Sequence, residues 1–309
     1  MIRNKSGTLP MADQTRKVYS SIALIVALSL AIVLLAPPPM VPGQSFVVGI
    51  QSEAALPPPD LSALPQSMID EAGTLAEGIF GYSAELQDEL ATELLATYQA
   101  AQGKDVVVFF NTGGFGWDAI SETEEGQGFI NGIGAELESL GLNPLLLNFR
   151  RTAKTINGSA SEFLLATGYY PTKSKDLATR VKFLTDHIPA IKVILAGLSN
   201  GTLICDSVMN ILKDNQRLFS IQLGPPFWND AASTERTLVL RSNGVIPDSF
   251  SQVDIITIMR ANIEAFFGVN QQYPGDILAY IGAPGHDYMW QYAEVQSRII
   301  FFLHNNVWP

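Results

Sequence analysis

Short apolar runs alternate with stretches of helical periodicity from residue 84 to residue 305, and this alternation constrains the fold more than any other feature. Each run is apolar on both faces, as in strands of a parallel sheet that helices cover on each side. The alternation predicts an α/β domain with a doubly wound, mostly parallel sheet of about six strands, sandwiched by helices. The predicted strands are 106–110, 145–148, 193–196, 219–223, 238–240 and 277–281. The predicted helices are 84–101, 128–140, 175–187, 200–212, 253–267 and 292–305.

The N-terminal part carries an apolar segment, 18–36, that contains no charged residue. As a helix it would be about 28 Å long, enough to cross the hydrocarbon core of a bilayer. The next charged residue after it is Glu53. The positive-inside rule then predicts a cytoplasmic segment 1–17, a transmembrane anchor 18–36 and a C-terminal part outside the cytoplasm. The basic residues before the anchor are Arg3, Lys5, Arg16 and Lys17.

A cleaved signal peptide followed by secretion is the alternative for this segment. The apolar run continues directly into three prolines, 37–39, which are a poor cleavage site, so we expect an uncleaved anchor. Residues 37–65 contain eight prolines and read as a semi-rigid linker. The folded domain is predicted to span 66–309.

Charge and composition exclude several classes of function. The formal net charge of −11 argues against a nucleic-acid partner, whose phosphates the protein would repel. The single cysteine, Cys205, excludes an intramolecular disulfide and a cysteine-based metal site, and its position on an apolar helix face predicts a buried, inert thiol. With only three histidines in the chain, we do not expect a histidine-based metal site either, and we expect no cofactor.

The segment 197–201 reads Gly-Leu-Ser-Asn-Gly and lies between a predicted buried strand and a predicted amphipathic helix. Ser199 is therefore expected on a sharp strand-to-helix turn, where flanking glycines relieve crowding. The backbone amide of Asn200 would lie at the helix N-terminus, where partial positive charge can stabilise an oxyanion. A glycine-rich loop, 112–116, follows the first core strand, and Gly114 or Phe115 is expected to supply the second oxyanion donor.

A serine nucleophile at position 199 would need a general base, and elimination among the three histidines identifies the candidate. His187 precedes a strand at the edge away from Ser199, and His304 ends the last helix, so both are expected to be structural. His286 follows the last predicted strand and precedes the final helix. It is therefore expected at the carboxyl edge of the sheet, together with Ser199.

Taken together, the region 106–305 resembles the α/β-hydrolases, and the loop at 112–116 resembles their His-Gly-Gly oxyanion loop with Thr112 in place of the histidine. The resemblance implies acyl transfer to Ser199, general-base work by His286 and hydrolysis of an ester-like bond. The first two strands of the family lack counterparts in the sequence, and the short connection 224–236 leaves no room for a large cap domain.

The acid of the expected triad is open among three residues. At the family's usual spacing after strand 238–240 stands Asn243, and the first carboxylate beyond it is Asp248. Asp230, after the preceding strand, is the other alternative, whereas Asp254 is placed to cap the helix that begins there. We take Asp248 as the acid, because an asparagine would orient His286 without stabilising the imidazolium.

The sequence thus predicts a membrane-tethered, extracytoplasmic serine hydrolase of the esterase, lipase or thioesterase kind, acting on a small-molecule or lipid ester. The alternative is a catalytically weak or inactive hydrolase-fold binding module at the cell surface, which Asn243 at the acid position would favour. Acyl transfer to an acceptor other than water uses the same residues and is not distinguished by the sequence.

Overall fold

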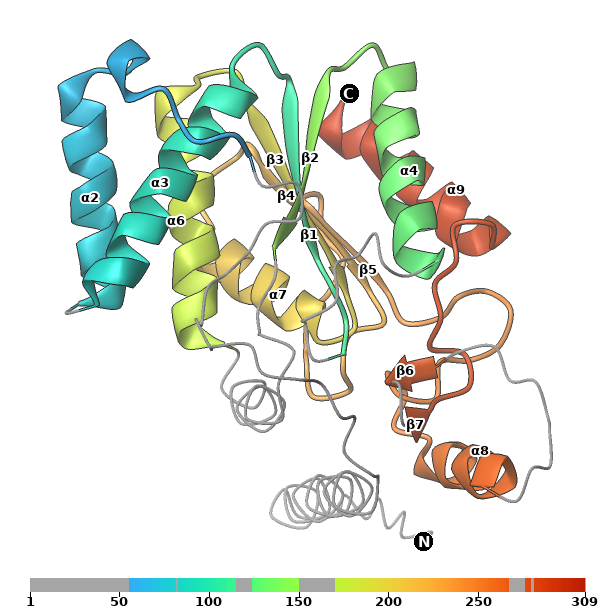
Figure 1. Ribbon diagram of the computed structural model, residues 1–309. Coiled ribbons are helices and arrows are strands. Elements are labelled where there is room, and N and C mark those ends of the chain that lie inside the picture. The colour runs from blue at the N-terminus through green and yellow to red at the C-terminus, as the bar shows by residue number, and fades with distance from the viewer. Residues whose placement is uncertain are drawn as a thin grey trace, which may run out of the picture. The chain divides into compact units, whose positions relative to one another are not determined.

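A computed structural model of the chain describes residues 56–81, 83–114, 124–149, 170–266, 276–278 and 281–308. Its centre is a five-stranded, fully parallel sheet with strand order β2-β1-β3-β4-β5 (Figure 1). The strands are β1 Val106–Asn111, β2 Pro144–Phe149, β3 Lys192–Leu198, β4 Leu218–Leu223 and β5 Thr237–Leu240. Five of the six predicted strands are therefore confirmed, and so is the parallel α/β class.

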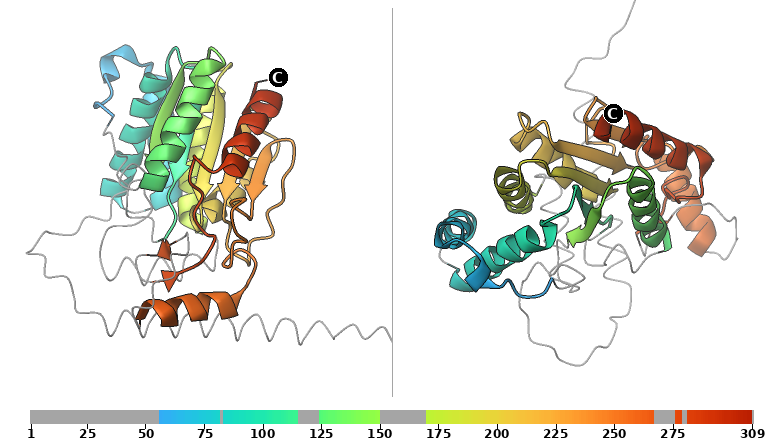
Figure 2. Two further views of the ribbon diagram at one scale, coloured as in Figure 1. Left: turned by 90° about the vertical axis from the view of Figure 1, so that its right-hand side faces the viewer. Right: turned by 90° about the horizontal axis from the view of Figure 1, so that it is seen from above.

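Helices cover both faces of this sheet (Figure 2). On β1, Val106, Val108 and Phe110 pack against α4 and α9, whereas Val107 and Phe109 pack against α6 and α7. Burial on both faces explains why the strand sequences are continuously apolar. The helices of the first face are α4 Glu124–Ser139 and α9 Ala293–Phe302, and those of the second are α3 Ala84–Ala101, α6 Pro171–His187 and α7 Gly201–Ile211. A π-helical turn, Leu303–Val307, follows α9.

The strand β2 forms one edge of the sheet and is its least buried member, with four of its six residues partly exposed.

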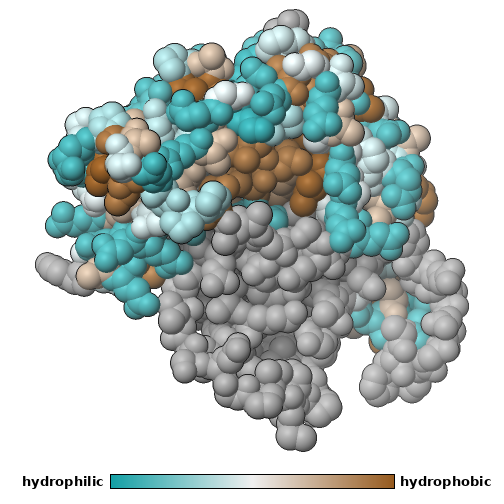
Figure 3. Space-filling model, turned by 45° about the horizontal axis from the view of Figure 1, so that its top comes forward, coloured by the Kyte–Doolittle hydropathy of each residue, from teal (hydrophilic) through white to brown (hydrophobic). Residues whose placement is uncertain are grey.

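Most of the described surface in Figure 3 is hydrophilic (teal), and apolar side chains (brown) gather in the middle of that view.

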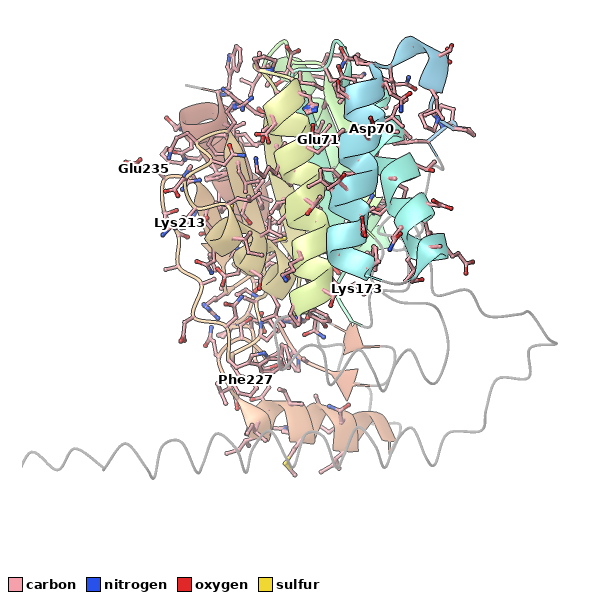
Figure 4. All side chains as sticks on the ribbon, turned by 90° about the vertical axis from the view of Figure 1, so that its left-hand side faces the viewer. Asp70, Glu71, Lys173, Lys213, Phe227 and Glu235 are labelled. Carbon is pink, nitrogen blue, oxygen red and sulfur yellow. The ribbon has the colours of Figure 1, made fainter. Side chains whose placement is uncertain are left out.

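A third layer lies outside the second face. Helix α2 Gln66–Phe80 packs on α3, and their shared apolar cluster includes Phe183 of α6. Residues 56–65, which we predicted as the end of the linker, contact α3: Asp60 and Gln99 exchange two hydrogen bonds of 2.8 and 2.9 Å. Among these residues a short 3-10 helix spans Leu61–Ala63. Figure 4 labels Glu71 on α2, beside the end of α6.

The expected sixth parallel strand, 277–281, is wrong. Residues Asp276–Leu278 (β6) and Ile281–Gly282 (β7) pair with each other in a separate antiparallel sheet. Gly282 is tied to helix α8 Ile255–Phe266, since the Asn262 side chain accepts from its N–H (3.0 Å) and donates to its carbonyl (2.8 Å). The strands β6 and β7 thus pair with each other, Gly282 is bonded to α8, and neither strand pairs with β5.

The topology places a site at one end of the sheet. Because β1 lies between β2 and β3, the strand order reverses at the β1–β3 pair, and open α/β sheets bind ligands outside the carboxyl ends of such strands. This is the lower end of the sheet in Figure 1, where α7 begins.

Several predicted features lie outside the described residues: the segments 1–17 and 18–36, the linker up to residue 55, and Phe115. In the part of the chain that is described, no helix combines the length and the hydrophobicity needed to cross a membrane.

Candidate active site

Ser199 occupies the turn between β3 and α7 in a left-handed backbone conformation, with φ of 47°. Non-glycine residues rarely adopt this conformation, and it stores strain that the surroundings must hold. Three hydrogen bonds do so here: Ser199 N–H donates to the carbonyl of Leu223 (2.9 Å), and the N–H and hydroxyl of Thr202 donate to the carbonyl of Ser199 (2.9 and 2.7 Å). The predicted strand–turn–helix setting of the serine is therefore present.

The two glycines of the motif are needed because neighbouring atoms fill the space that a side chain would take. A Cβ on Gly201 would lie 2.2 Å from the carbonyl oxygen of Asn111, at the end of β1. A Cβ on Gly197 would lie 2.8 Å from the sulfur of Cys205 and 3.0 Å from the backbone of Gly201. Helix α7 can thus begin close against β1 only where the motif has glycine.

The loop after β1 packs directly on this turn. A Cβ on Gly113 would lie 3.1 Å from the Cβ of Ser199, and Gly114 has a φ of 54°. The side-chain amide of Asn200 donates to the carbonyl of Gly114 (3.2 Å), which fixes the loop to the start of α7. Of the three residues predicted for the oxyanion hole, Asn200 and Gly114 therefore lie next to Ser199, and Phe115 is outside the described residues.

His286 is paired with Asp248. Its Nδ1 lies 2.9 Å from Oδ2 and 3.1 Å from Oδ1 of the carboxylate. The side chain of His286 is 3% exposed and that of Asp248 is fully buried, so water scarcely competes for this contact. The geometry fixes the imidazole so that Nδ1 serves Asp248 and Nε2 is the nitrogen left for chemistry.

Asp248 accepts further hydrogen bonds from its own loop and from the segment that follows His286. The backbone N–H groups of Phe250 and Ser251 donate at 2.9 and 3.0 Å, the Ser251 hydroxyl at 2.8 Å, and the Tyr288 hydroxyl at 2.7 Å. Burial alone would raise the pKa of Asp248, but the contact with His286 and the hydrogen bonds from the Ser251 amide and the Tyr288 hydroxyl hold that pKa below its usual value. The carboxylate is thus kept ionised beside the imidazole.

The other two acid candidates do not reach His286. Asn243 donates to Asp287 (2.9 Å) and accepts from the amides of Val245 and Ile246, so it shapes the loop after β5. Asp230 is exposed on the connection after β4.

Asp254 caps α8, as expected. It accepts from the N–H (3.1 Å) and the hydroxyl (2.7 Å) of Thr257, and these bonds lower the pKa of Asp254.

Gly224, at the end of β4, brings the serine and histidine parts of the site together. The residue before it, Leu223, accepts the Ser199 N–H, and a Cβ on Gly224 would lie 2.8 Å from Cε1 of the His286 ring. Among the described residues, the Ser199 hydroxyl has no hydrogen-bond partner and is buried. Catalytic hydrogen bonds are often long in ligand-free enzymes and tighten when substrate binds.

An aromatic cluster lines the other side of His286. Phe250 meets the imidazole edge-on with ring centroids 5.0 Å apart, and Phe227 and Trp228 pack on Phe250 at 6.2 and 5.8 Å. Figure 4 labels Phe227 at the end of the molecule where α8 lies.

The remaining histidines and the cysteine have structural contacts. His187 stacks on Phe183 with centroids 4.5 Å apart and pairs with Glu71, and His304 contacts Glu136. Cys205 is fully buried, as its helical position predicted. Among the residues that the structure describes, no cluster of histidine, cysteine and carboxylate side chains could hold a metal ion.

Two residues of the site were missed by sequence reasoning. Tyr288 donates to Asp248, and Glu125, in the first turn of α4, accepts the backbone N–H of Tyr288 (2.6 Å). The sequence signal for Tyr288 was its closeness to His286. For Glu125 there was none, because it lies 163 positions away from Tyr288, its partner.

Solved structures of two hydrolases show a distant similarity to this chain. No protein-family model matches the chain, and no curated protein matches it. A cutinase from Trichoderma reesei, solved with a phosphonate inhibitor, is 14% identical with a TM-score of 0.43, over 78% of this chain and 94% of the cutinase. A hydrolase from Oleispira antarctica is 16% identical with a TM-score of 0.25, over 54% of this chain and 50% of that one.

Proposed function

We propose that the protein is a serine hydrolase of the α/β-hydrolase type that cleaves an ester-like bond through an acyl-Ser199 intermediate. One observation carries this proposal: a buried Asp248–His286 pair packs on Gly224, and the preceding residue, Leu223, accepts the N–H of a serine held in a left-handed turn at the start of a helix. This constellation provides a nucleophile, a base and a group that orients the base.

In the acylation step the Ser199 oxygen attacks the carbonyl carbon of the substrate while its proton passes to Nε2 of His286. Asp248 stabilises the imidazolium that forms. The negative charge on the carbonyl oxygen is stabilised by the Asn200 amide at the helix N-terminus and by an amide of the loop at Gly114. The attack gives a tetrahedral intermediate. When this intermediate collapses, the bond to the leaving alcohol or thiol breaks and that group takes the proton from His286.

In the deacylation step water replaces the leaving group. His286 takes a proton from the water, the hydroxide attacks the acyl carbon, and the bond between the acyl group and Ser199 breaks. The proton then returns to Ser199 and the acid is released. No step requires a metal or an organic cofactor.

The substrate class that we propose is a small-molecule or lipid ester. The rings of Phe227, Trp228 and Phe250 support an apolar substrate, because they offer an apolar surface beside His286. We further propose that residues 18–36 anchor the protein in a membrane with the hydrolase domain outside the cytoplasm, and this part rests on the sequence alone.

The test is covalent labelling by a fluorophosphonate probe. The native protein should be labelled, Ser199→Ala should abolish the label, and Asp248→Asn should slow labelling by a factor on the order of 10³ to 10⁴, since it removes the charge behind His286. Ser297→Ala, at an exposed position on α9, is the matched control and should label at the native rate. Persistent labelling of Ser199→Ala would exclude Ser199 as the nucleophile.

A further inference from the structure

Glu125 lies in the first turn of α4, and its carboxylate faces the segment that carries His286. Its Oε1 accepts the backbone N–H of Tyr288 at 2.6 Å, across 163 positions of sequence. The side chain is partly buried, and His286 and Asp287 are close enough to interact with it electrostatically. Its neighbour in the sequence, Glu124, is exposed, so the two glutamates of this turn differ in environment.

Tyr288 connects this glutamate to the proposed triad. Its backbone N–H is held by Glu125, while its buried hydroxyl donates to Oδ2 of Asp248 at 2.7 Å. The same Oδ2 contacts Nδ1 of His286. The Tyr288 ring also meets the imidazole edge-on, with centroids 6.1 Å apart. A displacement of Tyr288 would therefore disturb both the acid and the base.

Other contacts fix the ends of this segment. Gly285, with φ of 81°, lies so close to Pro247 that a Cβ would approach its carbonyl oxygen to 2.3 Å. On the far side, Trp290 packs over Gly132 of α4, whose Cβ would lie 2.1 Å from the indole. Between these two points, the bond to Glu125 joins the backbone at Tyr288 to the body of the domain.

Keeping a carboxylate in this place is unfavourable for stability. Burial raises the pKa of Glu125, while the Tyr288 N–H and the nearby His286 partly oppose that rise. A carboxylate that accepts an amide N–H makes a charge-assisted bond, stronger than one to a neutral acceptor. A partly buried acid retained at such a cost, next to a site, is a candidate for a functional role.

We propose that Glu125 is a positioning residue: by holding the backbone of Tyr288 it fixes the Asp248–His286 pair in the geometry that activates Ser199. The inference rests on the proposed hydrolase function and goes beyond the triad itself. Glu125 has no hydrogen bond to Ser199 or to His286 among the described contacts, and the proposed effect acts through the backbone of Tyr288 rather than through the charge of the carboxylate.

The first test compares two substitutions at this position. Glu125→Ala removes the acceptor, and kcat for a p-nitrophenyl ester should fall by about tenfold or more with KM changed less than twofold, because the base is displaced. Glu125→Gln keeps an oxygen acceptor and should recover most of the loss. Glu124→Ala, one residue away on the exposed side, should behave as the native protein. Equal rates for Glu125→Ala and Glu124→Ala, or a Gln variant as slow as the Ala variant, would overturn the proposal.

A double-mutant cycle tests whether the effect passes through Tyr288. Tyr288→Phe removes the bond to Asp248 and leaves the N–H that Glu125 holds. If Glu125 acts through Tyr288, the losses in kcat for Glu125→Ala and Tyr288→Phe should be strongly non-additive. Additive losses would contradict this route. The Gln and Phe variants keep the test informative if Glu125→Ala does not fold.

A spectroscopic readout separates this inference from the hydrolase proposal. The proton on His286 Nδ1 that faces Asp248 should give a downfield proton resonance, assigned by its loss in His286→Gln. We expect the resonance to persist in Glu125→Gln and to shift or broaden in Glu125→Ala. An unchanged resonance in Glu125→Ala would refute the positioning role even if the protein hydrolyses esters. A changed resonance in a protein that takes no fluorophosphonate would support the positioning role and refute the hydrolase.

Discussion

At the scale of a single residue, Gly224 combines a left-handed backbone conformation with a close approach to the Tyr288 and His286 rings. Its φ is 59°, and a Cβ there would lie 2.7 Å from the Tyr288 ring and 2.8 Å from His286. We expect Gly224→Ala to displace the imidazole and to lower the fluorophosphonate labelling rate by about 100-fold, as a misplacement of roughly 1 Å does elsewhere.

The matched control is Gly103→Ala. Gly103 also has a positive φ, 72°, but a Cβ there would meet nothing within 4 Å. Both variants should lose about 1 kcal/mol or more of unfolding free energy from backbone strain, and only Gly224→Ala should lose labelling. Urea denaturation gives the first quantity and probe labelling the second. Equal labelling losses in the two variants would show that crowding at His286 is not the cause.

At the scale of an element, the first turn of α4 carries Glu125, an acid whose pKa is raised in the folded protein. The folded-state pKa of Glu125 lies above its ordinary value of 4.5, so the native state binds more protons than the unfolded state as pH rises past that value. Stability is therefore lost as pH rises through the folded pKa. Glu125→Gln should raise the thermal midpoint at pH 8, and the gain should vanish near pH 3, where both states are protonated. An equal gain at both pH values in differential scanning fluorimetry would contradict this expectation.

Elements whose sequence signal is local were predicted well. The expected helix 84–101 is confirmed without a shift, and β1 differs from its prediction by one residue, because helical periodicity and buried apolar runs are read within a short window. The hairpin of β6 and β7 was mistaken for a sixth parallel strand, since an apolar run does not reveal its pairing partner.

The candidate site divides along the same line. The turn at Ser199 is marked by the five residues 197–201. The cap at Asp254 and the buried helix face at Cys205 were also predicted from residues close to them in the sequence. The choice between Asn243 and Asp248 depended on how the loop after β5 folds back toward His286, which spacing alone does not give. Glu125 reaches Tyr288 only because the fold brings α4 against the last connection.

At the scale of the whole domain, helix α3 is joined to α6 by an ion cluster on the second face of the sheet. Arg180 of α6 is 7% exposed in its side chain, and it contacts the fully buried Asp176 at 2.7 Å and Glu93 of α3. Burial alone would lower the pKa of Arg180, but the two carboxylates raise it, so the guanidinium stays charged. The cluster therefore lies between two helices that cover the same face of the sheet.

We expect a substitution of Arg180 to lower the free energy of unfolding strongly and to leave the reactivity of Ser199 almost unchanged. Arg180→Met leaves Asp176 buried without its cation, and removing one partner of a buried pair costs about 3–5 kcal/mol. Arg298→Met breaks an exposed pair with Glu294 and should cost less than about 1 kcal/mol. Urea unfolding measures both, and fluorophosphonate labelling of the folded Arg180→Met variant should stay close to native, because the cluster and Ser199 do not share partners. A labelling loss as large as that of Gly224→Ala would mean that the contact between α3 and α6 also sets the geometry of the site.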